Sequence, residues 1–184
     1  ALGNVLVFKK IRTKLGTGFR QGVSGGGALP PNIDAFFWAI GVSVTEGYGL
    51  TETAPVVSVR PLGHPVFGTI GKPLSCTKVK IVDDSGNELP AGKLGTVMIR
   101  GTSVMKGYYK RQDLTDAVID KDGWFDSGDL GMKTIDDELI LRGRKKDTIV
   151  LRGGENIEPV PIEMKLQESP FISQAVVIGQ DQRF

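Results

Sequence analysis

Residues 47–53 read Gly47-Tyr48-Gly49-Leu50-Thr51-Glu52-Thr53, directly after a strand that we predict at 42–44. This short loop combines a flat aromatic ring, two glycines, hydroxyl groups and a carboxylate. The ring of Tyr48 is suited to a purine face, and glycines let the main chain approach a phosphate closely. Thr51 and Glu52 carry oxygens that suit a phosphate and its Mg²⁺. The loop is therefore typical of a nucleotide site, although a glycine-bounded turn after a strand explains it equally well.

A glycine run stands upstream of this loop. Gly25-Gly26-Gly27 lies between a predicted strand near 19–23 and a predicted helix over 31–40. The helix prediction rests on apolar residues at i, i+3, i+4 and i+7, which would form one buried face: Ile33, Phe36, Phe37 and Ile40. Bare backbone between a strand and a helix N-terminus suits a flat base or an anionic group. On its own, the run is weak evidence for a site, because most glycine runs are flexible loops.

Two further segments follow downstream, Asp122-Gly123-Trp124-Phe125-Asp126-Ser127-Gly128-Asp129-Leu130-Gly131 and Leu141-Arg142-Gly143-Arg144-Lys145-Lys146-Asp147. In isolation, Asp129 is an ordinary turn carboxylate and the basic run is a solvated face. Taken in order and at these spacings, the four segments resemble the second half of the adenylate-forming enzymes. That superfamily includes acyl-CoA synthetases, luciferases and peptide-synthetase adenylation domains.

The resemblance implies a nucleotide-binding role for several matched residues. The segment Gly25-Gly26-Gly27 would border the adenine, and Tyr48 would stack on it. Thr51 would contact the α-phosphate, and Glu52 would hold Mg²⁺. These last two residues are the catalytic candidates, because catalysis of adenylate formation would rest on charge stabilisation at the α-phosphate.

The ribose assignments also come from the resemblance. Asp129 occupies the position whose carboxylate accepts hydrogen bonds from both ribose hydroxyls, and an ionised carboxylate is an acceptor that can take two donors. Arg144 occupies the position that supports ribose and phosphate, where a guanidinium fork suits anions. Lys146 matches the hinge between the large and small domains.

Other matched segments concern the framework and the substrate class. Gly95–Gly101 and Lys106-Gly107-Tyr108-Tyr109 match a strand and a Gly-Tyr element that we interpret as framework. The Arg-Lys-Lys-Asp pattern of 144–147 resembles long-chain fatty acyl-CoA synthetases, whereas Asp126-Ser127 stands where their signature usually has His-Thr. Residues 153–157 and 161–163 resemble the start of a mobile C-terminal domain.

The implied reaction has two steps, with Mg²⁺ as the cofactor and ATP, a fatty acid and coenzyme A as substrates. A carboxylate attacks the α-phosphate of ATP to give acyl-adenylate and pyrophosphate, and the thiol of coenzyme A then displaces AMP. The residues before 25 contain no phosphate loop ending in lysine, and those up to 184 contain no adenylation lysine, so we expect a fragment that is inactive alone. Alternatives are an amino-acid- or aryl-acid-activating ligase, or a non-catalytic nucleotide-binding or interaction module.

Composition bounds the remaining possibilities. With 184 residues, 40% hydrophobic, the chain can form a core, and a net charge of +2 is too small to indicate nucleic acid as a partner. We interpret the single Cys76 as a small buried hydrophobe and His64 as a loop residue. The sequence shows no transmembrane run and no signal peptide, which favours the cytoplasm and leaves peripheral membrane contact and oligomeric state open.

The predicted fold class is α/β, in three parts. Residues 1–62, with a helix through Leu2, Val5 and Leu6, are expected to end a large α/β layer. Residues 63–143 are expected to form a small antiparallel sheet or distorted barrel, with strands at 78–82, 95–99 and 139–141. Residues 144–184 are expected to begin a small α+β domain, with strands at 148–151 and 175–178. A helix over 160–168 lies between these strands, and Pro170 is expected to close it.

Overall fold

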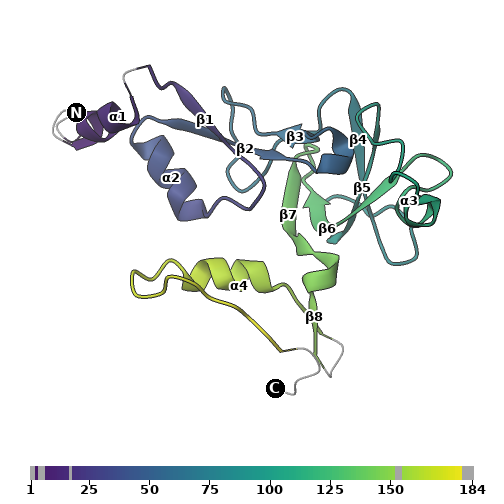
Figure 1. Ribbon diagram of the computed structural model, residues 1–184. Helices are drawn as coiled ribbons and strands as arrows, with labels where there is room; N and C mark the ends of the chain where they lie inside the picture. Colours follow the sequence, from purple (N-terminus) through teal and green to yellow (C-terminus); the bar gives the residue numbers. More distant parts are fainter. Residues whose placement is uncertain (1–2, 4–6, 17, 152–154, 180–184) are drawn as a thin grey trace.

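The computed structural model describes the chain except for residues 1–2, 4–6, 17, 152–154 and 180–184. Its described elements form three small sheets with helices beside them, in a mixed α/β arrangement (Figure 1). The predicted α/β class is confirmed. The division at 62/63 and 143/144 stays a prediction; the first of these boundaries falls in the irregular segment between the first and second sheets.

The N-terminal sheet contains a parallel pair joined through a helix. After α1 (Lys9–Leu15), β1 (Gln21–Ser24) pairs in parallel with β2 (Ser43–Tyr48), and α2 (Pro31–Ala39) connects them. β3 (Ser58–Val59) then adds to β2 in the antiparallel direction. β2 is longer than the predicted strand, so Tyr48 ends a strand instead of lying in a loop. The helix expected through Leu2, Val5 and Leu6 lies outside the described residues.

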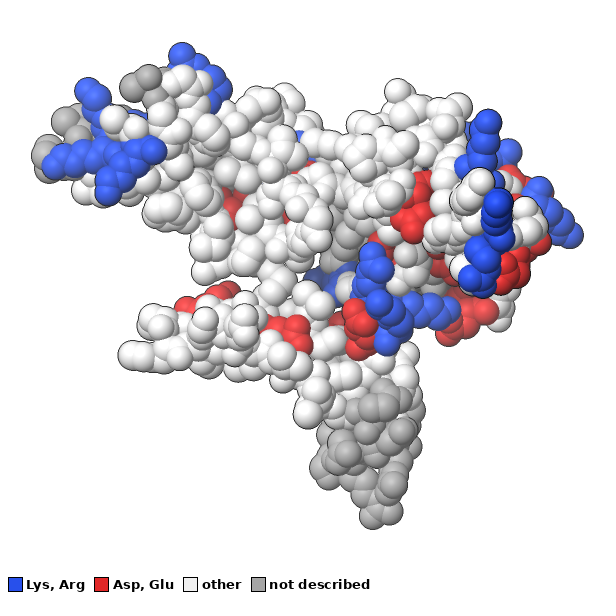
Figure 2. All heavy atoms as spheres, viewed as in Figure 1, with Lys and Arg blue, Asp and Glu red and all other residues white. Residues whose placement is uncertain are grey.

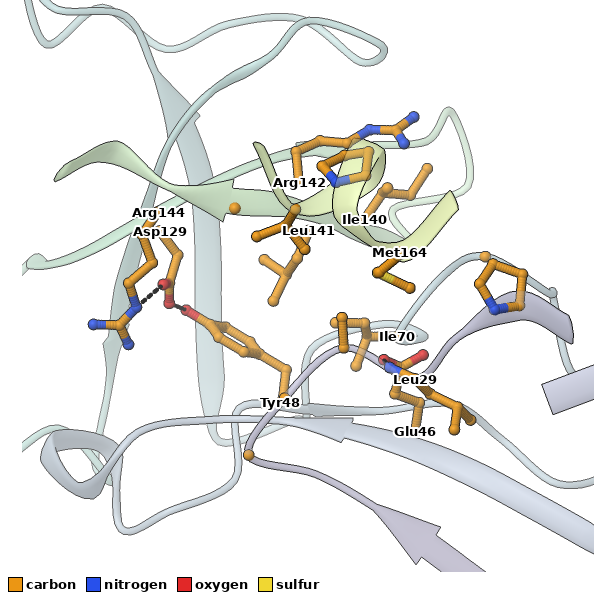
Figure 3. A pocket seen from close by; sticks show the side chains of 18 of the residues that line it. Leu29, Glu46, Tyr48, Ile70, Asp129, Ile140, Leu141, Arg142, Arg144 and Met164 are labelled. Carbon is orange, nitrogen blue, oxygen red and sulfur yellow. Dashed lines mark hydrogen bonds and ion pairs between the residues drawn. The ribbon is translucent and has the colours of Figure 1, made fainter. Parts of the chain in front are cut away.

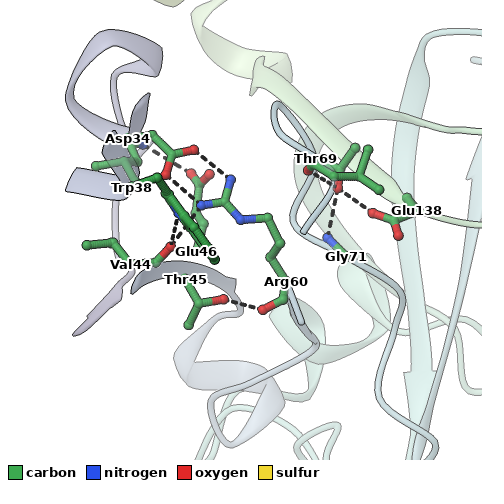
Figure 4. Close-up of polar contacts among 11 residues, drawn as sticks. Asp34, Trp38, Val44, Thr45, Glu46, Arg60, Thr69, Gly71 and Glu138 are labelled. Atoms are coloured by element: carbon green, nitrogen blue, oxygen red, sulfur yellow. Dashed lines mark hydrogen bonds and ion pairs between the residues drawn. The ribbon is translucent and has the colours of Figure 1, made fainter. Parts of the chain in front are cut away.

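The predicted buried face of α2 is wrong in part, because Ile40 is buried, at 1% exposed, whereas Ile33 and Phe36 are not. Ile33 and Phe36 are 40% and 45% exposed, whereas the buried residue of the helix is Asp34. Its carboxylate accepts two hydrogen bonds from the Arg60 guanidinium, both of 2.7 Å, and Arg60 is 1% exposed (Figure 4). A buried charge needs such pairing, so this fork turns Asp34 toward the sheet and rotates Ile33 and Phe36 away.

The central sheet is antiparallel in the order β4-β5-β6-β7, with bounds Thr77–Val82, Gly95–Gly101, Phe125–Lys133 and Leu139–Arg144. Its predicted antiparallel character is confirmed. Apolar side chains from these strands and from β2 and the β2–β4 connection form one cluster: Tyr48, Val57, Ile70, Val79, Ile81, Val97, Ile99, Phe125 and Leu139. Each fully buried aliphatic side chain in this cluster stabilises the fold by about 1.5–3 kcal/mol.

Asp129 lies inside strand β6, not in a turn as we expected. Burial along Phe125–Lys133 alternates, with residues 125, 127, 129 and 131 facing inward. Two of these inward positions are polar and are satisfied by defined partners. The Ser127 hydroxyl donates to the Val97 carbonyl at 2.7 Å, and Asp129 accepts from Tyr48.

The C-terminal part begins with η3, a 3₁₀ helix over Lys145–Asp147, and continues through β8 (Ile149–Val150), β9 (Asn156–Ile157) and α4 (Pro159–Leu166). The predicted strand at 175–178 is wrong, because the Val177 N–H donates to the Glu163 carboxylate at 2.9 Å and residues 175–178 adopt no strand. The helix ends four residues before Pro170, so Pro170 does not close it. Gly153 and Gly154 lie outside the described residues.

The structure also tests the expectations for Cys76 and His64 and shows how charge is distributed over the surface. Cys76 is exposed, so the buried-hydrophobe interpretation is wrong; it precedes β4 in a surface turn. His64 lies in an exposed bend, as expected. Basic side chains gather over α1, whereas both signs are mixed over the central sheet (Figure 2). Among the described helices, none is both long and apolar enough to cross a bilayer.

Candidate nucleotide site

A cavity of about 470 Å³ lies where the three parts of the chain meet. The glycine segment after β1 and the end of β2 form one wall, and β6, β7 and α4 form the opposite side (Figure 3). Its lining includes Gly26, Gly27, Leu29, Glu46, Tyr48, Ile70, Asp129, Ile140, Leu141, Arg142, Gly143, Arg144, Pro161 and Met164. Apolar walls with a few convergent polar groups are typical of small-molecule sites.

Three of the predicted residues form one hydrogen-bonded group at the edge of this cavity. The Tyr48 hydroxyl donates to Oδ2 of Asp129 at 2.6 Å, and Nε of Arg144 lies 3.1 Å from Oδ1 (Figure 3). Asp129 and Arg144 are direct partners in the β6–β7 register, so the sheet itself sets their pairing. The ring orientation of Tyr48 is therefore fixed at both ends, by strand β2 and by the carboxylate.

Burial controls the protonation of this group. The Tyr48 pKa is raised, first by burial and then by the negative charge of Asp129, so its hydroxyl stays a donor at neutral pH. Burial also raises the pKa of Asp129, against the opposing effects of the Tyr48 hydrogen bond and the Arg144 charge. Each carboxylate oxygen keeps acceptor capacity beyond its one internal donor, because an ionised carboxylate has about four lone-pair sites.

Glu46 is a cavity residue that our sequence analysis missed. Its Oε1 accepts a hydrogen bond from the Leu29 N–H at 3.0 Å, which ties the glycine segment to β2. Burial raises the pKa of Glu46, although the Leu29 hydrogen bond lowers it. The signal was present in the sequence, because residues two apart in a strand point to the same face and Glu46 precedes Tyr48 by two.

The glycine segment lies between β1 and α2, as predicted, and beside the end of β2. Gly26 has φ of 84°, a conformation that favours glycine, and both Gly26 and Gly27 line the cavity. Gly25 lies outside the lining, and a Cβ added there would approach the Gly47 carbonyl to 3.3 Å. The structure therefore assigns Gly25 to close packing of two chain segments and Gly26-Gly27 to the cavity wall.

Thr51 and Glu52 lie in η2, a 3₁₀ helix over Thr51–Thr53 that follows the cavity residues Tyr48 and Gly49. Both lie outside the cavity lining, and Thr51 is exposed. Oε1 of Glu52 accepts a hydrogen bond from the Tyr108 hydroxyl at 2.9 Å. We had interpreted Tyr108 only as framework, so this contact links the Gly-Tyr element to a candidate catalytic carboxylate.

The residues around Glu52 fit Mg²⁺, although they do not form a closed metal cage. Within the described part of the chain, no group of three or more His, Cys, Asp or Glu side chains could hold a metal. Mg²⁺ does not need one, because it is commonly bound by one or two carboxylates together with substrate phosphates and water. A partly exposed carboxylate with one hydrogen-bonded oxygen is suited to that mode of binding.

The predicted hinge lies in η3, which directly follows the cavity residue Arg144. Lys146 is the exposed middle residue of η3, between Arg144 on the cavity edge and β8. On one side, Lys145 forms an ion pair of 2.7 Å with Asp84 of the central part. On the other, the Thr148 hydroxyl donates to Glu158, the residue before α4, at 2.8 Å. η3 is thus the short link between two anchored segments.

Comparison with known proteins identifies a family of AMP-binding enzymes. A family model described as AMP-binding enzyme matches residues 4–109, and a model of the AMP-binding enzyme C-terminal domain matches residues 146–184. The first spans more than half of the chain.

Individual relatives agree with the family models. The chain is 51% identical to "Probable acyl-activating enzyme 16, chloroplastic" of Arabidopsis thaliana, over 99% of the chain and 27% of that protein. It is 46% identical to a chloroplastic long-chain-fatty-acid–[acyl-carrier-protein] ligase of Arabidopsis thaliana, over 99% of the chain and 26% of that ligase. The chain thus spans about a quarter of the length of these relatives.

A solved structure shows the same fold. The chain is similar to o-succinylbenzoate CoA synthetase from Bacillus subtilis in complex with its acyl-adenylate intermediate. The TM-score is 0.83 at 29% identity, over 95% of the chain and 37% of that protein.

Proposed function

Because the chain belongs to the AMP-binding enzyme family, we propose that it forms part of a larger ligase that activates a carboxylic acid with ATP and transfers the acyl group to a thiol. One observation supports this proposal above all. The fold brings Gly26-Gly27, Tyr48, Asp129 and Arg144, which are far apart in sequence, to one cavity.

The cavity residues have complementary roles toward a nucleotide in this proposal. The Tyr48 ring stacks on the adenine, with Gly26-Gly27 alongside, because aromatic faces and bare backbone accept a flat base. Asp129 accepts hydrogen bonds from the two ribose hydroxyls while it retains its Tyr48 and Arg144 partners. Arg144 is 49% exposed as a side chain, so its guanidinium is free to support the ribose and phosphate as well.

Charge stabilisation at the α-phosphate is assigned to η2. The Thr51 hydroxyl contacts an α-phosphate oxygen, and the Glu52 carboxylate holds Mg²⁺. When bound, Mg²⁺ neutralises phosphate charge and polarises the phosphoryl oxygen. Removing one fixed electrostatic contact in a comparable site costs about 2.7–4 kcal/mol of transition-state stabilisation. Glu52 is therefore expected to be indispensable for adenylate formation.

The acyl substrate proposed is a fatty acid. The Arabidopsis relative named as a long-chain-fatty-acid ligase, 46% identical, supports this choice, as does the Arg-Lys-Lys-Asp pattern of residues 144–147. An aryl acid is the second candidate, favoured by the fold similarity to o-succinylbenzoate CoA synthetase. The departure at Asp126-Ser127 from the long-chain signature also keeps an aryl-acid or amino-acid substrate open.

The acceptor proposed is coenzyme A, and an acyl carrier protein is the alternative. The similarity to a CoA synthetase of Bacillus subtilis supports coenzyme A, and the similarity to an acyl-carrier-protein ligase of Arabidopsis thaliana supports a carrier protein. The proposed compartment likewise has one alternative. We propose the cytoplasm, with a plastid as the alternative because both Arabidopsis relatives are named as chloroplastic.

A substrate panel with the full-length protein tests this function. Pyrophosphate release is measured with long-chain fatty acids, aryl acids and amino acids, and each active acid is then paired with coenzyme A or a carrier protein. The Glu52→Gln variant reports adenylation that depends on η2, and Asp137→Asn, an exposed carboxylate in the turn between β6 and β7, serves as a matched charge control. Fatty-acid-dependent pyrophosphate release that is lost only in Glu52→Gln supports the proposal. Nucleotide binding without release from any acid would favour the non-catalytic module.

A further inference from the structure

The carboxylate of Glu52 is held from a segment more than fifty residues downstream. The Met105 N–H donates to the Glu52 carbonyl at 2.7 Å, and the Tyr108 hydroxyl donates to Oε1 of Glu52 at 2.9 Å. One bond fixes the backbone of η2, and the other fixes the direction of the side chain. The segment 105–108 therefore acts on the candidate metal ligand at two points.

Tyr108 is itself fixed by packing against α3, the helix over Gln112–Val118. Its N–H donates to the Thr115 hydroxyl at 2.9 Å, and Thr115 is buried. At Gly107, with φ of 149°, an added Cβ would lie 2.7 Å from Cγ2 of Thr115, so only glycine allows this approach. The tyrosine hydroxyl is thus presented to Glu52 by a rigid turn and not by a free surface loop.

This arrangement leaves one carboxylate oxygen for a ligand. Within the described residues, Oε1 receives the Tyr108 hydrogen bond, and no donor contacts Oε2. A carboxylate whose rotation is already restricted loses less conformational freedom when it binds a cation. Hydrogen-bond partners of metal ligands orient those ligands in the same way.

We propose that Tyr108 is a positioning residue that orients Glu52 so that its free oxygen faces the Mg²⁺–ATP complex, an inference that rests on the proposed function. Tyr108 does not touch the nucleotide in this account and acts only through Glu52. Removal of such a partner typically lowers metal affinity or activity about 10- to 100-fold. We expect the lower end of this range, about 10-fold, because Tyr108 is 36% exposed and water can replace part of the bond.

The neighbouring tyrosine provides a matched control. Tyr109 is 86% exposed, and its ring lies 5.3 Å from the Lys110 ammonium, a surface contact. Tyr109→Phe removes the same atom as Tyr108→Phe, one residue away, without touching Glu52. A difference between the two variants therefore reports the Glu52 contact and not the loss of a hydroxyl from this segment.

The test is carried out on the full-length enzyme with two readouts. Binding of Mn²⁺ in the presence of ATP is followed by electron paramagnetic resonance, and the KM for Mg²⁺ and kcat are measured from pyrophosphate release. Tyr108→Phe should weaken Mn²⁺ binding about 10-fold and raise the KM for Mg²⁺, with the KM for the acceptor thiol unchanged. Tyr109→Phe should change none of these values.

A double-substitution cycle separates positioning from packing. In a Glu52→Gln background, Tyr108→Phe should cause no further loss of Mn²⁺ affinity, because its only route is through the Glu52 carboxylate. An equal further loss in that background, unchanged metal affinity in the single variant, or loss of folding in the absence of metal would each overturn the proposal. If the wild-type enzyme itself shows neither ATP-dependent Mn²⁺ binding nor pyrophosphate release, the proposed function fails and this inference falls with it.

Discussion

Replacement of Asp129 by asparagine tests whether this carboxylate accepts hydrogen bonds from the ribose hydroxyls. The variant keeps the shape of the side chain but turns one acceptor oxygen into a donor. Internally, both neighbours can still be satisfied, because the new amide can donate to the Tyr48 oxygen while the remaining carbonyl accepts from Arg144. The fold is therefore expected to persist.

The loss of stability follows from the two contacts. The buried Tyr48 hydrogen bond changes from one with an ionised carboxylate to one with a neutral amide, a loss of about 1 kcal/mol. The Arg144 ion pair has a side chain that is 49% exposed, so its contribution is discounted to the surface range of about 0.2–1 kcal/mol. We expect the free energy of unfolding to fall by about 1–2 kcal/mol, which leaves a folded enzyme.

The effect on nucleotide binding should be more specific. One ribose hydroxyl loses its acceptor, which costs about 1–3 kcal/mol, or about 5- to 150-fold in affinity. The assay is calorimetric titration of the full-length enzyme and of Asp129→Asn with AMP and with 2′,3′-dideoxy-AMP. The wild type should prefer AMP over the dideoxy ligand, and this preference should be about 5- to 150-fold smaller in the variant.

Asp137→Asn controls for the loss of one negative charge, because Asp137 is an exposed carboxylate that pairs with Lys133 at 2.6 Å on the surface. It should leave the preference for AMP unchanged. If Asp129→Asn keeps the full wild-type preference for AMP over the dideoxy ligand, the carboxylate does not contact the ribose. In that case its role would be limited to tying β6 to Tyr48 and Arg144.

Three further predictions concern the isolated chain, the hinge and pH. The 184-residue chain alone should form no acyl-adenylate from fatty acid, ATP and Mg²⁺ above background, and detectable acyl-AMP would refute this. The chain should still bind AMP weakly, and the absence of calorimetric heat at about millimolar AMP would count against the site. Lys146→Pro in the full-length enzyme should impair thioester formation far more than adenylation. The φ of a 3₁₀ helix is close to that of proline, so the substitution should hold η3 in the conformation seen here. Equal loss in both half-reactions, measured separately, would make Lys146 an ordinary surface residue. Because burial raises the pKa of Asp129 above its ordinary 3.8, the folded state holds more protons than the unfolded state between 3.8 and the raised value, so the free energy of unfolding should fall as pH rises through that interval. Denaturant titrations at several pH values should show that the free energy of unfolding changes less steeply with pH in Asp129→Asn than in the wild type. An unchanged pH dependence would refute this assignment.

Sequence patterns predicted most of the apolar elements, and the resemblance to adenylate-forming enzymes named the residues that meet at the cavity. The strands around 78–82, 95–99 and 139–141 and the helix that begins near residue 160 were recoverable because their apolar residues repeat with the periods of strand and helix. Tyr48, Asp129 and Arg144 were each named as a site residue, but the contacts among the three were not predicted. Their mutual hydrogen bonds depend on the β6–β7 register and on the approach of β2, which local sequence does not encode.

Three of the failures share a physical cause, which is a polar contact with a residue remote in sequence. In isolation Asp129 was interpreted as a turn carboxylate, whereas Ser127 and Asp129 occupy inward positions of β6, where Val97 and Tyr48 satisfy them. The face of α2 was assigned wrongly because Asp34 is buried by Arg60, which lies 26 residues away. Tyr108 was interpreted as framework for the same reason, since its partner Glu52 is remote in sequence.

The central claim is that the cavity beside Tyr48 binds the nucleoside part of the nucleotide. A crystal structure of the full-length enzyme with bound AMP tests this most directly. The account predicts the adenine against the Tyr48 ring and Gly26-Gly27, with the ribose hydroxyls on the Asp129 carboxylate. AMP bound elsewhere, with no nucleotide density at Tyr48, would contradict the claim. One such place is a hollow lined by Lys80 and Trp124, where the Lys80 ammonium lies 4.3 Å from the centre of the Trp124 ring.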